Sequence, residues 1–295
     1  MPRVSGVARN TFTSWAVVAG CCWPTTRTLI GLSSSSANQL PVPESASKPP
    51  AASAGGASGS AIDYGRLSKP PGAIDNAALG LFRMLVRGLF GLLFRLRVEG
   101  RPPASGGYVL AANHSSFLDP LILGSSLRRR VIYLMTETVW RSAASGWFYH
   151  WTRSIPLSAR GGNREALRAA RKVLKQGRVV CIFPEGGISR DGKLMLGSPG
   201  AVSLVLNEGM AIVPVGIVGA DDAMPVSGGF RLRRITIRYG KPISPEEIAA
   251  LGSDRKTRLR EATRLVMQRI AELVGQEARE DVLEAARQAE QAHGA

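Results

Sequence analysis

His114 and Asp119 stand five residues apart in the stretch VLAANHSSFLDP, which covers residues 109–120. On a regular helix, five positions rotate a side chain by about 140°, so the two residues would point to different faces. The spacing brings them together only if the chain bends between them. A carboxylate that reaches back to an imidazole ring orients it, and a neutral imidazole held in this way is a general base for a hydroxyl or an amine.

The elements around this pair favour such a bend. Tyr108–Ala112 is a short apolar run typical of a buried strand. A helix is expected from Phe117, with Ser115 or Ser116 as its N-cap. Asp119 and the proline after it then fall in the first helical turn, where an acid is favoured and the missing N–H of proline costs nothing. We therefore predict a histidine at the end of a strand, within reach of the aspartate.

The substrate, rather than the protein, is expected to supply the nucleophile. The pattern G-x-S-x-G does not occur in the sequence, which argues against an α/β-hydrolase. We therefore expect His114 to activate a hydroxyl group of the substrate, with no covalent intermediate on the protein. The other histidines are assigned different places: His150, in WFYHWTR, is a packing or interfacial residue, and His293 lies in the polar tail.

A second polar motif, FPEGGISRDGKL, follows another apolar run. Gly186 and Gly187 allow backbone N–H groups to approach an anion closely, and Arg190 and Lys193 add positive charge. Glu185 can hydrogen-bond a polyol or hold a neighbouring arginine. Taken alone, the motif is equally compatible with a hairpin turn that has a solvated basic tip.

The chain around these motifs alternates strand and helix patterns. The expected strands lie at residues 108–112, 128–136, 178–183, 211–220 and 233–240. The expected helices start at Phe117 or cover residues 164–176, 198–207 and 245–275. This alternation predicts an α/β fold with a mostly parallel sheet flanked by helices. Active residues tend to lie at the carboxyl ends of strands in such sheets, and His114 and Glu185 both take that position.

The composition indicates an anionic partner. The 295 residues include 38 Lys and Arg against 22 Asp and Glu, a formal net charge of +16. This charge suits nucleic acid, a membrane surface or phosphorylated substrates. Nucleic acid is disfavoured, because the aromatic residues are few and are not interleaved with the basic ones.

The cysteines predict neither disulfides nor a metal site. Cys21, Cys22 and Cys181 are the three cysteines of the chain, too few for a disulfide framework. Cys181 lies in an apolar run and is expected to be a buried core thiol. With no C-x-x-C pair and no second histidine near a cluster of cysteines or acids, no metal is expected.

Four regions are predicted along the chain. Residues 1–62 are rich in Ser, Ala, Pro and Gly and predict a disordered tail, which can carry an organellar targeting segment. Residues 63–100 are expected to hold an amphipathic, membrane-associating helix. Residues 101–275 form the α/β domain, and residues 276–295 a charged C-terminal helix or tail.

The stretch 76–100 is the most apolar of the chain. The side chains that fall within roughly a third of the helical circumference are Phe82, Leu85, Val86, Leu89, Leu92, Leu93 and Leu96. The arginines expected on the opposite side are Arg83, Arg87, Arg95 and Arg97. A basic amphipathic helix lies in the headgroup plane, with its arginines on lipid phosphates. A core-facing helix with a solvated basic side is the alternative.

Together the motifs resemble the 1-acylglycerol-3-phosphate acyltransferase family of the lysophospholipid acyltransferase superfamily. NHSSFLDP resembles its N-H-x-x-x-x-D block, and FPEGGISRDG its F-P-E-G block. SIPLSARGG, at 154–162, resembles the I-P-x-x-R block, and IVPVGI, at 212–217, the late V-P-V block. All four occur in order, so the resemblance extends from residue 75 to residue 245.

The resemblance implies a glycerolipid acyltransferase-like fold and an acyltransferase activity. A fatty acyl group would pass from acyl-CoA or acyl-carrier protein, as co-substrate, to the hydroxyl group of a lysophospholipid. The first-choice acceptor is 1-acylglycerol-3-phosphate, which gives phosphatidic acid in phospholipid synthesis. His114 would be the base and Asp119 its orienting partner. The residues assigned to substrate binding are Arg160, Glu185, Gly186, Gly187, Ser189 and Arg190.

The resemblance also implies a setting for the enzyme. We expect a peripheral or monotopic membrane protein that faces the cytoplasm, with membrane phospholipids as partners. Neither a metal nor a cofactor beyond the acyl donor is implied.

Two departures from the family blocks concern the phosphate-binding side. Gly187 and Ile188 stand where the commonest family block has Thr and Arg, and IPLSAR has one more residue before Arg160 than I-P-V-D-R. Another lysophospholipid or lipid acceptor is therefore an alternative. A non-catalytic lipid-binding protein of the same fold and a membrane-bound acyl-CoA hydrolase are the others.

Overall fold

The computed structural model describes residues 62–158, 161–206 and 208–277. Apart from Ile62, these residues belong to one compact unit that begins at Asp63. The predictions of a disordered tail at the start and of a charged helix or tail at the end lie outside the described residues, except for a few positions at their borders. Arg160 also lies outside them.

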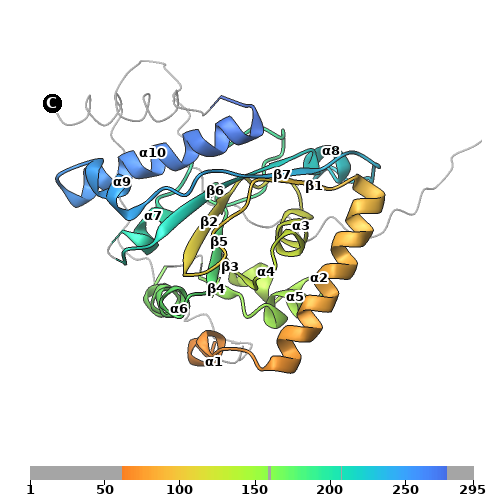
Figure 1. Cartoon of the computed structure of the whole chain (residues 1–295), viewed down its shortest axis with the longest axis horizontal. Helices are drawn as coiled ribbons and strands as arrows, with labels where there is room; N and C mark the ends of the chain where they lie inside the picture. The colour runs from red at the N-terminus through yellow and green to blue at the C-terminus, as the bar shows by residue number, and fades with distance from the viewer. Residues whose placement is uncertain (1–61, 159–160, 207, 278–295) are drawn as a thin grey trace, which may run out of the picture. The chain divides into compact units, whose positions relative to one another are not determined.

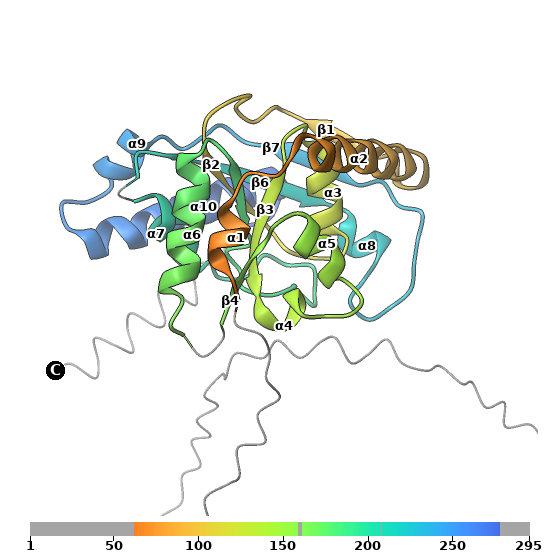
Figure 2. The ribbon, with the colours of Figure 1, turned by 90° about the horizontal axis from the view of Figure 1, so that it is seen from below.

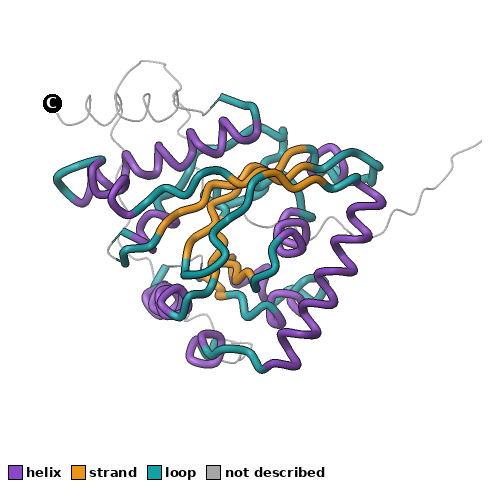
Figure 3. Tube along the Cα trace, in the orientation of Figure 1, coloured by secondary structure: helices purple, strands orange, loops and turns teal. Residues whose placement is uncertain are grey.

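A seven-stranded sheet forms the central layer, drawn in orange in Figure 3. Its strands are β1 (Arg97–Glu99), β2 (Tyr108–Ala112), β3 (Val131–Thr136), β4 (Ile155–Leu157), β5 (Val179–Ile182), β6 (Ala211–Val218) and β7 (Thr236–Tyr239). Their order is β1-β7-β6-β2-β5-β3-β4, and every neighbouring pair is parallel except β6 and β7. The prediction of a mostly parallel sheet is confirmed.

Helices cover both faces of this sheet (Figure 1, Figure 2). They are α1 (Tyr64–Ser68), α2 (Ala73–Phe94), α3 (Asp119–Ser126), α4 (Glu137–Trp140), α5 (Gly146–Trp151), α6 (Arg164–Lys175), α7 (Gly200–Val205), α8 (Ala220–Ala223), α9 (Pro245–Ala250) and α10 (Arg255–Val274). On one face, α6, α7 and α10 pack on the sheet, and on the other α2 packs on α3 and α4 on β3. Strands β2 and β5 are therefore buried along their whole length, and Cys181 in β5 is a buried free thiol as predicted.

Helix α2 ends earlier than predicted. The chain leaves it through Arg95, which has a left-handed backbone with φ of 48°. The residues Arg97–Glu99, expected to be helical, form β1 and pair with Thr236–Arg238 at the edge of the sheet. The prediction of a helix that runs to residue 100 is wrong here, because the sheet takes this segment as a strand.

The apolar side chains of α2 also do not share one face. Leu79, Phe90 and Phe94 are buried, whereas Leu85 is 62% and Leu92 is 81% exposed. The helix is apolar around most of its circumference, so one side packs on the domain while another remains exposed. By length and composition, α2 is the one described helix that is long and apolar enough to cross a membrane.

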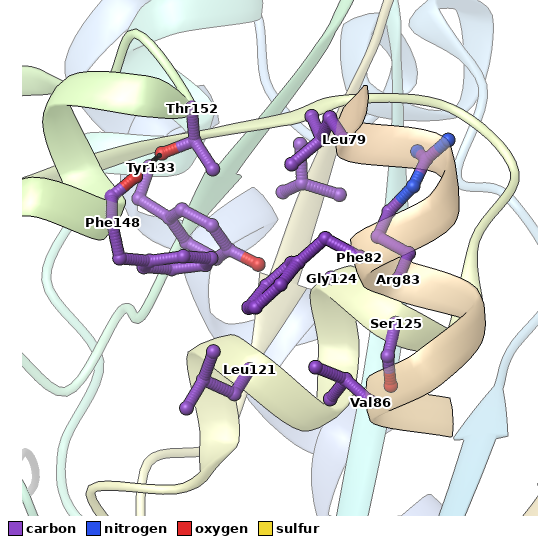
Figure 4. Close-up of a pocket in the computed structure, with 11 residues that line it drawn as sticks. Leu79, Phe82, Arg83, Val86, Leu121, Gly124, Ser125, Tyr133, Phe148 and Thr152 are labelled. Atoms are coloured by element: carbon purple, nitrogen blue, oxygen red, sulfur yellow. Dashed lines mark hydrogen bonds between the residues drawn. The ribbon is translucent and has the colours of Figure 1, made fainter. Parts of the chain in front are cut away.

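A small cavity marks the contact between α2 and the domain (Figure 4). From α2, Phe82 and Val86 line it, facing Leu121 of α3 and the rings of Tyr133 and Phe148. Its volume of about 10 Å³ has room for one water molecule. The cavity is therefore a gap in the packing and too small to hold a substrate.

Arg83 lies at the same contact (Figure 4), and not opposite the apolar residues as predicted. Its Nε and Nη1 atoms are buried without a hydrogen-bond partner among the described residues. Nearby, Asp75 anchors the start of α2: it forms an ion pair with Arg130 at 3.2 Å and accepts a hydrogen bond from Nε1 of Trp151 at 2.8 Å. One arginine thus faces the domain because this end of the helix is held against it.

Candidate active site

His114 follows β2 by two residues, and Asp119 is the first residue of α3. Nδ1 of His114 lies 2.9 Å from Oδ2 of Asp119, whose side chain is fully buried. The same Oδ2 accepts hydrogen bonds from the backbone N–H groups of Ser115 and Ser116, each at 2.8 Å. The contact predicted from the spacing of the two residues is present.

The bend between them differs from the predicted one. The N-cap of α3 is Leu118, with no side-chain cap, so the assignment of Ser115 or Ser116 is wrong. The carboxylate of Asp119 instead satisfies the backbone N–H groups of the bend from inside the helix. The Ser116 hydroxyl donates to the carbonyl of Met224 at 3.0 Å and so connects the bend to the chain after α8.

This arrangement favours one tautomer of the neutral histidine ring. Oδ2 of Asp119 already accepts two N–H groups, so Nδ1 of His114 carries the proton of their contact. Nε2 is then the atom with a free lone pair, and no described residue hydrogen-bonds to it. The His114 side chain remains 15% exposed. Nε2 can therefore accept a proton from a bound hydroxyl group.

Phe183 fixes the ring from its other side. The two ring centroids are 4.0 Å apart with an angle of 19° between the planes, so the rings are stacked. Phe183 directly follows β5, the parallel neighbour of β2. The two motifs found in the sequence therefore meet at the same edge of the sheet, as expected for the carboxyl ends of adjacent strands.

Glu185 connects the two motifs. Its Oε1 accepts the backbone N–H of His114 at 2.7 Å, and its Oε2 accepts the backbone N–H of Met195 at 2.8 Å. Both oxygens are engaged within the protein, so a substrate contact would use their remaining lone pairs. Burial raises the pKa of Glu185 to about 7, against the lowering effect of these two hydrogen bonds. The sequence indicated a polar residue here, but not that it holds the backbone of the histidine.

The other predicted binding residues lie in the loop after β5. Gly186 has φ of 74°, a conformation that favours glycine. Its backbone N–H donates a hydrogen bond to the carbonyl of Phe183, which closes a turn. The Ser189 hydroxyl donates within the loop, to Asp191 and to the carbonyl of Lys193, and its N–H donates to the carbonyl of His114. Ser189 therefore holds the loop against the histidine. Gly187 is half-buried, and Arg190 is exposed.

Two residues of the site were not predicted. Asn113 is buried, and its side-chain amide forms two hydrogen bonds with the backbone of Ile217 in β6, at 2.7 and 2.9 Å. It extends the pairing of β2 with β6 by one position, just before the histidine. Gln276 accepts the N–H of Leu194 at 2.8 Å and donates to the carbonyl of Gly192, so the chain just after α10 holds the loop. The sequence signal that could have indicated Asn113 is its position as a polar residue directly before His114. No local pattern in the sequence indicates Gln276.

The described residues contain no group of three or more His, Cys, Asp or Glu side chains placed to hold a metal ion. The groups gathered at this edge of the sheet are those of acid–base chemistry: an oriented imidazole, a buried carboxylate and a loop of backbone N–H groups. They suit proton transfer from a hydroxyl group.

Comparison with known proteins matches the region of the site to a family. A family model described as Acyltransferase matches residues 95–218, which include both motifs. This region of the chain therefore matches the acyltransferase family. The resemblance noted from the four sequence blocks is thereby confirmed.

Several relatives within this acyltransferase family bear the same name. The 1-acyl-sn-glycerol-3-phosphate acyltransferase of Bacillus subtilis is 27% identical over 172 residues, which cover 58% of this chain and 83% of the relative. The chloroplastic enzyme of that name from Arabidopsis thaliana is 26% identical over 57% of this chain and 49% of its own length. The enzyme of that name from Chlamydomonas reinhardtii is 30% identical over 51% of this chain and 46% of its own length. The chain thus spans about half the length of its plant and algal relatives.

A solved structure shares the acyltransferase fold. The 1-acyl-sn-glycerophosphate acyltransferase PlsC of Thermotoga maritima superposes with a TM-score of 0.55, at 21% identity, over 70% of this chain and 85% of that one. At this identity the likeness concerns the fold alone. It agrees with the mostly parallel sheet flanked by helices described above.

Proposed function

We propose that this chain transfers a fatty acyl group from acyl-CoA or acyl-carrier protein to the free hydroxyl group of a lysophospholipid. The first-choice acceptor is 1-acylglycerol-3-phosphate, and the product is phosphatidic acid. The observation that carries the proposal is the His114–Asp119 pair, in which Nδ1 is held at 2.9 Å and Nε2 faces no described partner. Relatives named for this reaction support the choice of acceptor.

The proposed mechanism uses His114 as a general base. Nε2 takes the proton of the acceptor hydroxyl as its oxygen attacks the thioester carbonyl. The carbon–sulfur bond then breaks, and the new bond between the acyl carbon and the acceptor oxygen remains as the ester. The imidazolium returns its proton to the sulfur, which leaves as a thiol. Asp119, fully buried and fixed by two backbone N–H groups, stabilises the imidazolium formed in between.

Binding of the acceptor phosphate is assigned to the loop after β5. Gly186 and Gly187 allow close approach to its backbone, and Arg190 adds an exposed positive charge. Arg160, the arginine of the block at 154–162, is proposed as a second phosphate ligand, because guanidinium groups bind phosphate bidentately. Glu185 and Ser189 are proposed to shape this subsite through the contacts that they make with the histidine backbone.

We also propose that α2 places this site at a membrane surface. Six of its large apolar side chains are exposed: Ile74, Leu81, Met84, Leu85, Leu89 and Leu92. An exposed apolar patch of this kind marks an interaction site, and the substrate is dissolved in lipid. The orientation towards the cytoplasm stays a prediction.

The test is product analysis with the full chain and a panel of acceptors. Palmitoyl-CoA is supplied with lysophosphatidic acid, with lysophosphatidylcholine or with no acceptor, and lipid products are separated by mass spectrometry. The proposal predicts phosphatidic acid with the first acceptor and little product with the second. Product from lysophosphatidylcholine alone would favour the alternative acceptor class. Fatty acid released without an acceptor would indicate hydrolysis, and binding without turnover a non-catalytic role.

A further inference from the structure

A groove lies between the end of α2 and the chain segment that leads into β7. Its lining consists of three leucines and three arginines: Leu92, Leu93, Arg95, Leu232, Arg233 and Arg234. Its volume of about 500 Å³ is within the range of small-molecule sites. Neither the catalytic pair nor the loop after β5 contributes to it.

The two walls of the groove are joined through their backbones. The N–H of Ile235 donates to the carbonyl of Phe94 at 3.0 Å, and the N–H of Arg97 donates to the carbonyl of Ile235 at 2.9 Å. The ring of Phe230 packs edge-on against that of Phe94, with centroids 5.2 Å apart. The arginine on the helix side is therefore held near the two on the loop side.

The positive charge of the groove has no described counterpart. Residues 223–235 contain three arginines and no acid, and no ion pair joins Arg95, Arg233 or Arg234 to a carboxylate within the part of the chain that the structure describes. By contrast, Arg238 in β7 pairs with Glu99 at 3.0 Å. Charges of one sign gathered without partners favour an anionic ligand.

The groove is also bordered by exposed apolar side chains. Leu232 is 69% and Phe230 is 56% exposed, next to Leu92 at the end of α2. Together they continue the exposed apolar side of α2 beyond the helix. A soluble anion would leave these side chains in water, whereas a lipid would cover them, because its phosphate and its acyl chains are joined in one molecule.

We propose that this groove binds the headgroup phosphate of an anionic phospholipid in a membrane, with Leu92, Phe230 and Leu232 entering the apolar region beneath it. Guanidinium groups bind the phosphate oxygens. The surface is a second membrane contact besides α2, and the inference does not depend on acyl transfer. The chain segment that leads into β7 also contacts the candidate active site, because the Ser116 hydroxyl donates to the carbonyl of Met224 at its start.

The experiment measures binding of the full chain to vesicles by sedimentation. One set of vesicles is phosphatidylcholine alone, and the other is an equal mixture of phosphatidylcholine and phosphatidylglycerol. Each arginine at an anionic surface contributes about a fivefold gain in partitioning. The variant Arg233→Gln/Arg234→Gln should therefore bind the mixed vesicles about thirtyfold more weakly, with little change on phosphatidylcholine alone.

The matched control is Arg255→Gln/Lys256→Gln, which removes two exposed charges at the start of α10. Its binding to mixed vesicles should change little. Equal losses in the two double variants would overturn the proposal, because net charge alone would then explain binding. Undiminished binding of the groove variant would overturn it as well.

Two further variants keep the test decisive if the groove variant does not fold, as judged by circular dichroism. Arg233→Lys/Arg234→Lys keeps the charge and loses the bidentate fork, so its binding should fall by less than that of the glutamine variant. Leu232→Ser should weaken binding to both kinds of vesicle. Unchanged binding of Leu232→Ser, or groove-dependent binding of a single-stranded RNA in place of vesicles, would contradict a lipid ligand.

Discussion

The backbone N–H of His114 donates to Oε1 of Glu185 at 2.7 Å, across 71 positions of the sequence. The other oxygen of Glu185 accepts the N–H of Met195 at 2.8 Å. The half-buried carboxylate of Glu185 thus joins the end of β2 to both ends of the loop after β5. The position of the histidine and the shape of the phosphate-binding loop consequently depend on the same side chain.

The burial of Glu185 should make stability depend on pH. The pKa of Glu185 rises from 4.5 to about 7 on folding, so the folded chain binds more protons than the unfolded chain between those values. The contribution of Glu185 to the free energy of unfolding therefore falls as the pH rises through this range, by at most about 3 kcal/mol. Glu185→Gln removes the titration. Urea unfolding should show the stability of the variant rising relative to that of the wild type from about pH 4.5 to about pH 7. A difference that stays constant over this range would contradict the raised pKa of Glu185.

Replacing Asp119 by Asn tests the orienting role. The amide is of the same size, but it carries no charge to stabilise the imidazolium and can leave the histidine in the other tautomer. We expect kcat to fall by about 10³-fold or more, with a smaller change in KM and a normal circular dichroism spectrum. An Asp119→Asn enzyme with nearly full kcat would show that the carboxylate serves only the bend.

Asn113 should matter for stability more than an exposed asparagine. Asn113→Ala leaves both the N–H and the carbonyl of Ile217 without their side-chain partner, which should cost about 2–4 kcal/mol of unfolding free energy. Asn76→Ala, at an exposed position of α2, is the control and should cost less than about 1 kcal/mol. Urea unfolding measures both, and equal losses would argue against the Asn113 contact.

The two sides of α2 should respond differently to substitution. Leu85→Ser/Leu89→Ser changes two side chains that are more than half exposed, so stability should remain near that of the wild type while partitioning into vesicles falls about tenfold or more. Leu79→Ala, at a position 2% exposed, should cost about 2–4 kcal/mol of unfolding free energy. The proposed membrane role of α2 would be contradicted by a double serine variant that binds vesicles as the wild type does.

The parts of the fold that could be predicted are those encoded locally. The strand Tyr108–Ala112 and the contact from His114 to Asp119 involve neighbouring residues, so hydrophobic pattern and spacing were sufficient. The alternation of strands and helices gave the mostly parallel sheet. The site was located because both motifs follow buried strands.

The parts that could not be predicted depend on distant partners. The contact between Gln276 and the loop at Leu194 joins residues 82 positions apart, and nothing in the local pattern indicates it. Arg83 faces the domain because α2 is apolar around most of its circumference, and a helical wheel cannot choose between its sides. Arg97–Glu99 forms a strand because it pairs with the free edge of β7. This pairing overrides the helical pattern that continues from the preceding residues.

The most direct test of the account is thiol release from palmitoyl-CoA by the full chain in detergent, with and without lysophosphatidic acid, for the wild type, His114→Ala and His150→Ala. His150 is an exposed histidine of α5 whose ring contacts that of Trp140, and it takes no part in the proposed chemistry. The account predicts acceptor-dependent release by the wild type and His150→Ala, and a loss of about 10³-fold or more for His114→Ala. Acceptor-dependent release that survives His114→Ala would contradict the assignment of His114 as the base.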